Sequence, residues 1–325
     1  MPRAPSAKDE IASLTKLRAD PRAATAGDQL DAALSRRSAA VVAAAARIVG
    51  EAELTEQTAA MTEAFARFMQ DPTKRDKGCL AKTALADALY KIEADVPDVF
   101  LTGIRHVQLE PVWGGKEDTA MELRGVCALG LVRINHHDVV IELAELLADP
   151  HVMARCSAAR AIAYGRFRDQ GLPLLRLKVR AGDDDPRVLE ACMEALMTLD
   201  AEHSLPFVTS YLEDEDVARR ETAALALGGS RRPEAVAPLR ALLERSVTEE
   251  ERRLAMLALA MLRQESALTL LLGILEDGSE HRAREVIETL ATYRHDGELL
   301  RRVTETADER GDPQLSAFAR ERFEA

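Results

Sequence analysis

The feature that most constrains the fold is a short pattern of small and aliphatic residues that recurs along the chain. The clearest copies are Arg124-GVCALGL-Val132, Arg155-CSAARAI-Ala163 and Arg220-ETAALAL-Gly228, and weaker copies begin at Arg37, Lys82, Leu189, Arg253 and Ala283. The later copies start 31, 34, 31, 33 and 30 residues apart, whereas the first two intervals are 45 and 42 residues. Self-similarity at such a period is the signature of a repeat architecture.

Small residues at successive turns of a helix let a second helix approach closely, and the aliphatic residue a turn later fills the gap. Each copy is therefore predicted to be the second helix of a pair. The first helices are predicted between the copies, at residues 138–149, 171–182, 204–214, 234–245, 267–277 and 297–308. Because a pair of about 30 residues cannot bury its own apolar face, neighbouring pairs must stack. The predicted fold is all-α, a right-handed α-solenoid of stacked antiparallel helix pairs.

The change in repeat length gives a prediction for the organisation of the chain. We expect an N-terminal tail and a capping helix in residues 1–20, with the helix over 7–19. Longer helical repeats are expected in 21–134, and repeats of about 31 residues in 135–325. The three segments are predicted to form one continuous solenoid.

Composition narrows the class of protein and of partner. Aromatic residues make up only 4% of the chain, so the core must be aliphatic, and the formal net charge is −12. Such a chain repels nucleic acid and anionic lipid on average. It has no apolar stretch of 18 residues, and its four cysteines show no disulfide or zinc spacing. We therefore expect a soluble cytoplasmic protein whose cysteines act as small buried hydrophobes.

The segments DPHVMARCSAARAIA and DDPRVLEACMEALM resemble HEAT repeats of the short bacterial kind, which also occur in phycobilisome-lyase-type proteins. The resemblance is good from about residue 120 to 310 and weaker from about 25 to 119. It implies that an aspartate in each turn pairs with the arginine that opens the second helix and braces neighbouring repeats. The matching residues are Asp149 with Arg155, and Asp216 with Arg219 or Arg220, while Leu189 interrupts the series.

Enzyme motifs are missing from the sequence. It contains no P-loop, no GxGxxG after a strand, no GxSxG and no HExxH. The HEAT-like deoxyhypusine hydroxylases hold their metal with paired His-Glu motifs, and no His here is followed directly by Glu. Nothing marks a tetrapyrrole pocket of the lyase type. We therefore predict no catalytic residue, no cofactor and no metal, and expect a protein that is not an enzyme.

One enzyme class stays open as the alternative, because a HEAT-like family of DNA glycosylases excises alkylated bases with Trp and Asp. The matching candidates are Trp113 and Asp118, with Arg124 or Arg155 for phosphate. A nucleic-acid binder needs a continuous basic row to neutralise phosphates. The sixth positions of the copies sample one helix edge and read Val42, Asp87, Leu129, Arg160, Glu194, Leu225, Ala258 and Glu288. This row is more acidic than basic, so we expect no nucleic-acid partner.

The single Trp lies in the segment HVQLEPVWGGKED, between Pro111 and the pair Gly114-Gly115. Helices cannot continue there, so a long loop from about Val107 to Lys116 is predicted. Two interpretations of Trp113 remain open. It either folds back to plug the junction between long and short repeats, or it faces outward as an anchor for a partner.

These observations favour a non-enzymatic HEAT-repeat scaffold that binds a protein or peptide on its concave face, which the second helices form. The acidic balance favours a partner with a basic surface. The residues predicted to bind the partner are Glu110, Trp113, Asp118, Arg124, Arg155 and Arg160.

Overall fold

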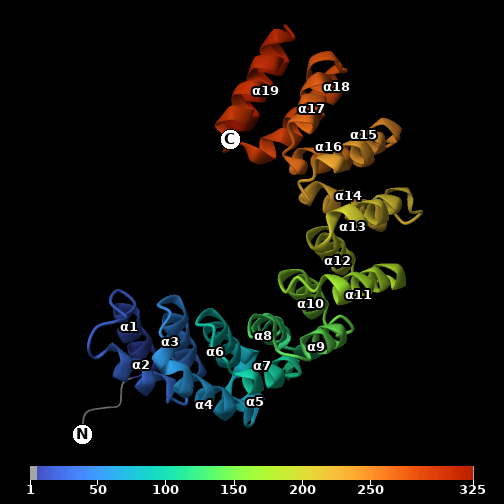
Figure 1. Cartoon of the computed structure of the whole chain (residues 1–325). Coiled ribbons are helices and arrows are strands. Elements are labelled where there is room, and N and C mark those ends of the chain that lie inside the picture. Colours follow the sequence, from blue (N-terminus) through green and yellow to red (C-terminus); the bar gives the residue numbers. More distant parts are fainter. Residues whose placement is uncertain (1–5, 325) are drawn as a thin grey trace. The chain divides into compact units, whose positions relative to one another are not determined.

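The computed structural model describes residues 6–324, which form helices and one β-hairpin (Figure 1). The predicted N-terminal tail falls mostly on residues 1–5, which lie outside the described residues. The chain divides into two compact units, residues 1–174 and 175–325. No helix in the described part of the chain is both long and apolar enough to cross a bilayer.

The first unit contains the longer repeats and the hairpin. Its elements are α1 (Ala7–Leu17), α2 (Ala26–Leu34), α3 (Ala39–Glu51), η1 (Thr55–Gln57), α4 (Thr58–Met69), α5 (Pro72–Arg75), η2 (Lys77–Cys79), α6 (Leu80–Lys91), α7 (Pro97–Ile104), β1 (Leu109–Val112), β2 (Gly115–Asp118), α8 (Met121–Arg133), α9 (Val139–Leu146) and α10 (Val152–Tyr164). The division between the units falls within α11 (Arg168–Ala181).

The second unit contains shorter repeats. Its elements are α12 (Pro186–Leu199), α13 (Ala201–Ser210), η3 (Tyr211–Glu213), α14 (Val217–Gly229), η4 (Pro233–Ala235), α15 (Val236–Arg245), α16 (Glu249–Leu262), α17 (Glu265–Asp277), α18 (Glu280–Leu290), η5 (Ala291–Tyr293), α19 (Gly297–Glu309) and α20 (Pro313–Glu324).

The small-residue copies coincide with α3, α6, α8, α10, α12, α14, α16 and α18, and the predicted first helices with α9, α11, α13, α15, α17 and α19. The prediction of an all-α repeat fold is confirmed. In the first unit α3, α6, α8 and α10 pack side by side in that order (Figure 1). In the second unit α12, α14, α16 and α18 do the same. The core lies along these rows, where most alanines of the copies are buried.

Side-chain caps fix where many of these helices begin. An aspartate, serine or threonine oxygen accepts a hydrogen bond from a first-turn amide at Asp185, Asp200, Asp216, Thr248, Ser279 and Asp296. The N-terminal helix α1 begins at a capping box formed by Ser6 and Asp9. Because a cap satisfies amides that the helix leaves free, these residues fix the start of a helix in successive repeats.

Close approach between α14 and α16 depends on Gly228. A Cβ at this position would lie 2.7 Å from the carbonyl oxygen of Ala258 and 2.9 Å from its Cα. Both are backbone atoms, so the two helices would have to move apart. We expect Gly228→Ala to lower the free energy of unfolding by about 1–3 kcal/mol, measured by urea denaturation.

Gly273 in α17 is the matched control, because nothing lies within 4 Å of a Cβ built there. Gly273→Ala should raise stability by about 0.5–1 kcal/mol, since alanine loses less backbone entropy in a helix. Equal changes in stability for the two substitutions would show that helix propensity, not close packing, determines the effect of Gly228→Ala.

Candidate partner-binding site

The segment around Trp113 is a β-hairpin rather than the loop that the sequence predicted. Strands β1 and β2 pair antiparallel, from Leu109 opposite Asp118 to Val112 opposite Gly115. Trp113 and Gly114 form the two-residue turn, and Gly114 has φ +94°, in the region that favours glycine. Pro111 can occupy β1 because both strands of a two-stranded sheet are edge strands, where a proline is tolerated.

The hairpin carries its apolar side chains toward solvent. Trp113 is 103% exposed, and Val107, Leu109 and Val112 are between 45% and 56% exposed. The interpretation of Trp113 as a buried plug is therefore wrong. The turn at Gly114 places the indole at the hairpin tip, where it has no core to enter, so only the outward orientation remains.

Polar side chains join the hairpin to the helical body. Gln108 is buried and donates from Nε2 to the carbonyl of Asp76 at 2.7 Å. Glu110 Oε1 accepts from the Gly78 amide at 2.7 Å and from the Thr119 hydroxyl at 3.1 Å. The alternation of the strand is thus inverted, with polar residues facing the protein and apolar residues facing water.

Arg124 in α8 holds the base of the hairpin. Its guanidinium is 2% exposed; Nη1 lies 2.7 Å from Asp118 Oδ2 and donates to the carbonyl of His106 at 2.9 Å. Nη2 donates to Asp149 Oδ1 at 3.0 Å, and Nε lies 2.8 Å from Asp149 Oδ2. One buried cation therefore links β2, the chain before β1 and the turn that precedes α10.

A second buried ion pair lies where Gln108 meets the body. Lys82 Nζ donates to Asp76 Oδ2 at 2.9 Å, and both side chains are fully buried. The Asp76 carboxylate also accepts from the amides of Ala81 and Lys82, at 2.8 and 3.0 Å. It thus caps the start of α6 while its own carbonyl binds the hairpin.

The environment changes the pKa values of the groups in this network. Burial by itself would raise the pKa of Asp118, but hydrogen bonds from the Ala120 and Gln108 amides and the Arg124 charge outweigh it and hold the pKa below its usual value. The pKa of Glu110 is lowered in the same way, against burial, by Gln108, Gly78 and Thr119. Both carboxylates are therefore stabilised as anions.

The lowered pKa values predict how stability depends on pH. A carboxylate whose pKa is lower in the folded state stabilises the fold above its unfolded pKa, and that stabilisation is lost as pH falls through the folded value. Hydrogen exchange of hairpin amides should therefore show constant protection from pH 7 to 5 and a loss below about pH 4. Asp118→Asn should flatten this profile, whereas parallel profiles for the two proteins would contradict the assignment to Asp118.

A groove of about 460 Å³ lies between α8 and α10 on the face of the second helices. Its apolar lining comes from Met121, Val126, Leu129 and Met153, and Glu122, Ser157 and Arg160 supply polar groups. Arg160 is exposed, in contrast to the other two predicted arginines, Arg124 and Arg155.

The comparison with known families identifies the repeats. The family model for HEAT repeats matches residues 142–224 and 205–291. Residues 142–291 of the chain are HEAT repeats. Among curated protein sequences, no match to the chain was found.

Several solved structures are similar to the HEAT-repeat chain at low sequence identity. Escherichia coli YibA is 16% identical, with 100% of this chain and 99% of that chain covered and a TM-score of 0.38. The complex of CpcE and CpcF of phycocyanin lyase from Nostoc sp. is 17% identical, with 87% and 93% covered and a TM-score of 0.37. Human deoxyhypusine hydroxylase is 15% identical, with 89% and 98% covered and a TM-score of 0.30.

Ion pairs between the turns and second helices of this HEAT-repeat protein differ in part from those that the resemblance implied. The Asp149 carboxylate is bound by Arg124 of the preceding pair. Arg155 instead donates to the backbone carbonyls of Asp149 and Pro150, at 2.9 and 3.0 Å. The expected pairing of Asp149 with Arg155 is therefore wrong. The partner of Asp149 is Arg124 in α8, which reaches forward to this turn.

The second expected pairing is present in a loose form. Arg219 Nε lies 3.8 Å from Asp216 Oδ2. Arg220 donates to the carbonyl of Asp214 at 2.9 Å and, like Arg124, reaches forward, to Glu251 at 3.3 Å. Arg124 and Arg220 therefore each bind their own turn through a carbonyl and the next pair through a carboxylate.

The burial of the candidate residues also argues against their expected roles in a glycosylase. Arg124 and Arg155 are 2% and 6% exposed, so neither guanidinium is placed to contact a phosphate. Asp118 is engaged by Arg124 and by two backbone amides. Of the candidates for that activity, Trp113 remains accessible.

One group in the described residues has the composition of a metal site. Ligand atoms of Glu249, His281 and Glu285 lie within 4.8 Å of one another. Arg252 Nε lies 3.6 Å from Glu285 Oε2, and Arg253 Nη2 lies 2.6 Å from Glu249 Oε1. Both carboxylates already face positive charges, so we interpret the group as an ion-pair cluster. That the chain holds no metal stays a prediction.

The four cysteines are buried, as predicted. Burial raises the pKa of Cys79 to about 11 and raises the pKa of Cys127 well above its usual value. Because the thiolate is the reactive form, both thiols are poor nucleophiles at neutral pH.

Proposed function

We propose that this HEAT-repeat protein is a non-enzymatic scaffold that binds a protein or peptide partner through its first unit, with Trp113 as the anchor. The observation that carries the proposal is the fully exposed Trp113 at the tip of a hairpin whose base is held by buried ion pairs. Water-exposed tryptophan adds nothing to a core, whereas at interfaces it is among the residues that contribute most to binding.

The anchoring network supports this function because it limits the entropy lost on binding. Gln108, just before β1, binds the carbonyl of Asp76, which precedes η2, and Asp118 in β2 pairs with Arg124 of α8. A partner would therefore meet Trp113 and Leu109 on a pre-ordered surface. Preorganised binding surfaces gain affinity because fewer groups become ordered on association.

The predicted binding residues divide into two roles under this proposal. Trp113 and Arg160 are exposed and are proposed to touch the partner, Arg160 from the groove between α8 and α10. Glu110, Asp118 and Arg124 are engaged in the hairpin network and are proposed to position it. Arg155 holds the turn before α10.

The partner is proposed to carry a basic surface. The chain has a net charge of −12, and long-range attraction between opposite charges accelerates encounter more than it strengthens the final complex. The association rate of the complex should therefore fall as salt concentration rises, with a smaller change in the dissociation rate.

Trp113→Ala is the direct test. Partner capture from extracts of the native cell, read by mass spectrometry, identifies the proteins that co-purify with the unmodified chain. For the protein among these that binds most tightly, the binding free energy should weaken by at least about 2 kcal/mol in the variant. Stability should change by no more than about 0.5 kcal/mol, because the indole is exposed.

Val247→Ala in the second unit is the matched control, because Val247 is 86% exposed and lies outside the proposed site. It should leave capture unchanged. Equal losses in both variants would indicate non-specific hydrophobic retention. Unchanged capture by Trp113→Ala would exclude the hairpin as the anchor.

A further inference from the structure

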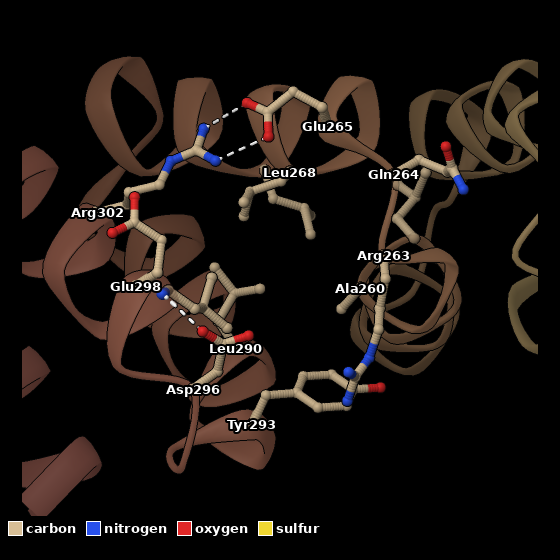
Figure 2. A pocket seen from close by; sticks show the side chains of 13 residues that line it. Ala260, Arg263, Gln264, Glu265, Leu268, Leu290, Tyr293, Asp296, Glu298 and Arg302 are labelled. Carbon is tan, nitrogen blue, oxygen red and sulfur yellow. Dashed lines mark hydrogen bonds and ion pairs between the residues drawn. The ribbon is translucent and has the colours of Figure 1, made fainter.

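The second unit contains a small pocket between two consecutive turns of the repeat (Figure 2). The end of α16 and the start of α17 form one wall, and the end of α18 with the start of α19 forms the other. Its volume is about 160 Å³, and its apolar lining comes from Leu259, Leu268, Leu271, Leu290 and Leu299. Leu290 and Leu299 are buried, so the floor is a packed apolar surface.

Most charged groups on the rim are already neutralised. Glu265 accepts two hydrogen bonds from Arg302, at 2.7 and 2.9 Å, as Figure 2 shows. Glu298 is held by Arg301, whose Nε donates at 3.0 Å. Asp296 accepts from the Leu299 amide at 3.2 Å, where it caps α19. Each of these carboxylates would have to give up a partner within the protein in order to bind a ligand.

Arg263 differs from the other rim charges. Its guanidinium lies over the ring of Tyr293, 5.0 Å from the ring centroid, at the edge of the pocket (Figure 2). Among residues 6–324 no carboxylate or carbonyl accepts a hydrogen bond from its side chain, although five N–H donors are available. Stacking on an aromatic ring orients a guanidinium but leaves its edge free for an oxyanion.

We propose that this pocket binds a small monocarboxylic acid with a branched aliphatic or aromatic body. The carboxylate would pair with Arg263, since planar guanidinium donors match the two oxygens of a carboxylate. The body would cover the leucine floor. Ligand sites of this kind combine an apolar lining with a few polar groups that fix orientation.

The probes are 4-methylpentanoate and 3-phenylpropionate, each compared with its primary amide. Amide chemical shifts of the ¹⁵N-labelled full chain should saturate at Leu268, Tyr293 and Leu299 with either acid. The amides should bind at least about tenfold more weakly, because the charge-assisted hydrogen bonds are lost.

Arg263→Ala should weaken the acids about tenfold to hundredfold and leave binding of the amides unchanged. Arg282→Ala is the matched control, because Arg282 is an exposed arginine of α18 that does not line the pocket, and it should bind like the unmodified chain. No saturable shift at these residues, equal binding of acid and amide, or equal loss in both arginine variants would overturn the proposal.

A further arm separates a free acid from the carboxyl end of a polypeptide, which presents the same chemistry. The probe is a pentapeptide that ends in leucine with a free carboxylate, compared with the same peptide as its C-terminal amide. Binding of the free-carboxylate peptide without binding of either small acid would overturn the assignment to a small acid. Binding of the small acids, with or without the peptide, supports it.

Discussion

Arg124→Met is expected to lower the free energy of unfolding of the first unit by about 3–5 kcal/mol. The guanidinium is buried and shared between Asp118 and Asp149, which are 15% and 11% exposed. Methionine keeps much of the volume and removes the charge. Two partly buried carboxylates would then lack their cation, and loss of one partner of a buried pair costs more than the pair contributes.

The effect should be localised as well as large. Arg124 also binds the carbonyl of His106, so the hairpin and the turn before α10 should lose amide protection together. Urea denaturation followed by circular dichroism measures the size of the effect, and hydrogen exchange measures its place. Arg160→Met is the control, since Arg160 is exposed on the neighbouring helix α10, and it should change stability by no more than about 0.5 kcal/mol. A similar small change for Arg124→Met would show that its ion pairs contribute little.

The helical rows could be predicted from the sequence because close packing restricts residue type. Where two helices touch, only a small side chain fits, as at Gly50, whose Cβ would lie 2.9 Å from the Cα of Ala88. A similar constraint applies at Gly228 in α14, whose Cβ would lie 2.9 Å from the Cα of Ala258, and a constraint that recurs in this way produces a repeat in the sequence. Local rules for caps and breakers then place the helix ends to within a few residues.

The hairpin could not be predicted in the same way. Val107 and Leu109 alternate with Gln108 and Glu110, which is a strand pattern, but it covers only a few residues before Pro111. The usual rule would also turn its apolar side inward. That side faces water because the partners of its polar side, at Asp76 and Gly78, are about 30 positions earlier in the chain.

The position of Trp113 could not be predicted for a related reason. Tryptophan is buried on average, so the residue type by itself favours an inward plug. Its orientation depends on a two-residue turn and on the ion pairs that hold both strands. The metal-like group of Glu249, His281 and Glu285 was also missed, although the spacing of His281 and Glu285 by four residues puts both on one face of α18.

Asp76→Ala is expected to destabilise the first unit by about 3–5 kcal/mol, because it leaves the ammonium of Lys82 fully buried without its carboxylate. The same substitution removes the acceptor for the first amides of α6. Lys82→Met should cost less, about 1–3 kcal/mol, because the remaining Asp76 carboxylate still accepts two backbone hydrogen bonds at the positive end of a helix.

The order of the two variants distinguishes an ion pair from a capping site. If the ion pair with Lys82 were the whole interaction, both substitutions would cost the same. If Asp76 acts also as the cap of α6, Asp76→Ala must be the more damaging, and exchange of the α6 amides must rise more in it than in Lys82→Met. Lys91→Met is the control, because Lys91 pairs with Asp87 on the partly exposed surface of the same helix, at 2.7 Å, and should cost no more than about 0.5 kcal/mol. Urea denaturation and hydrogen exchange of the three variants, measured side by side, test the order.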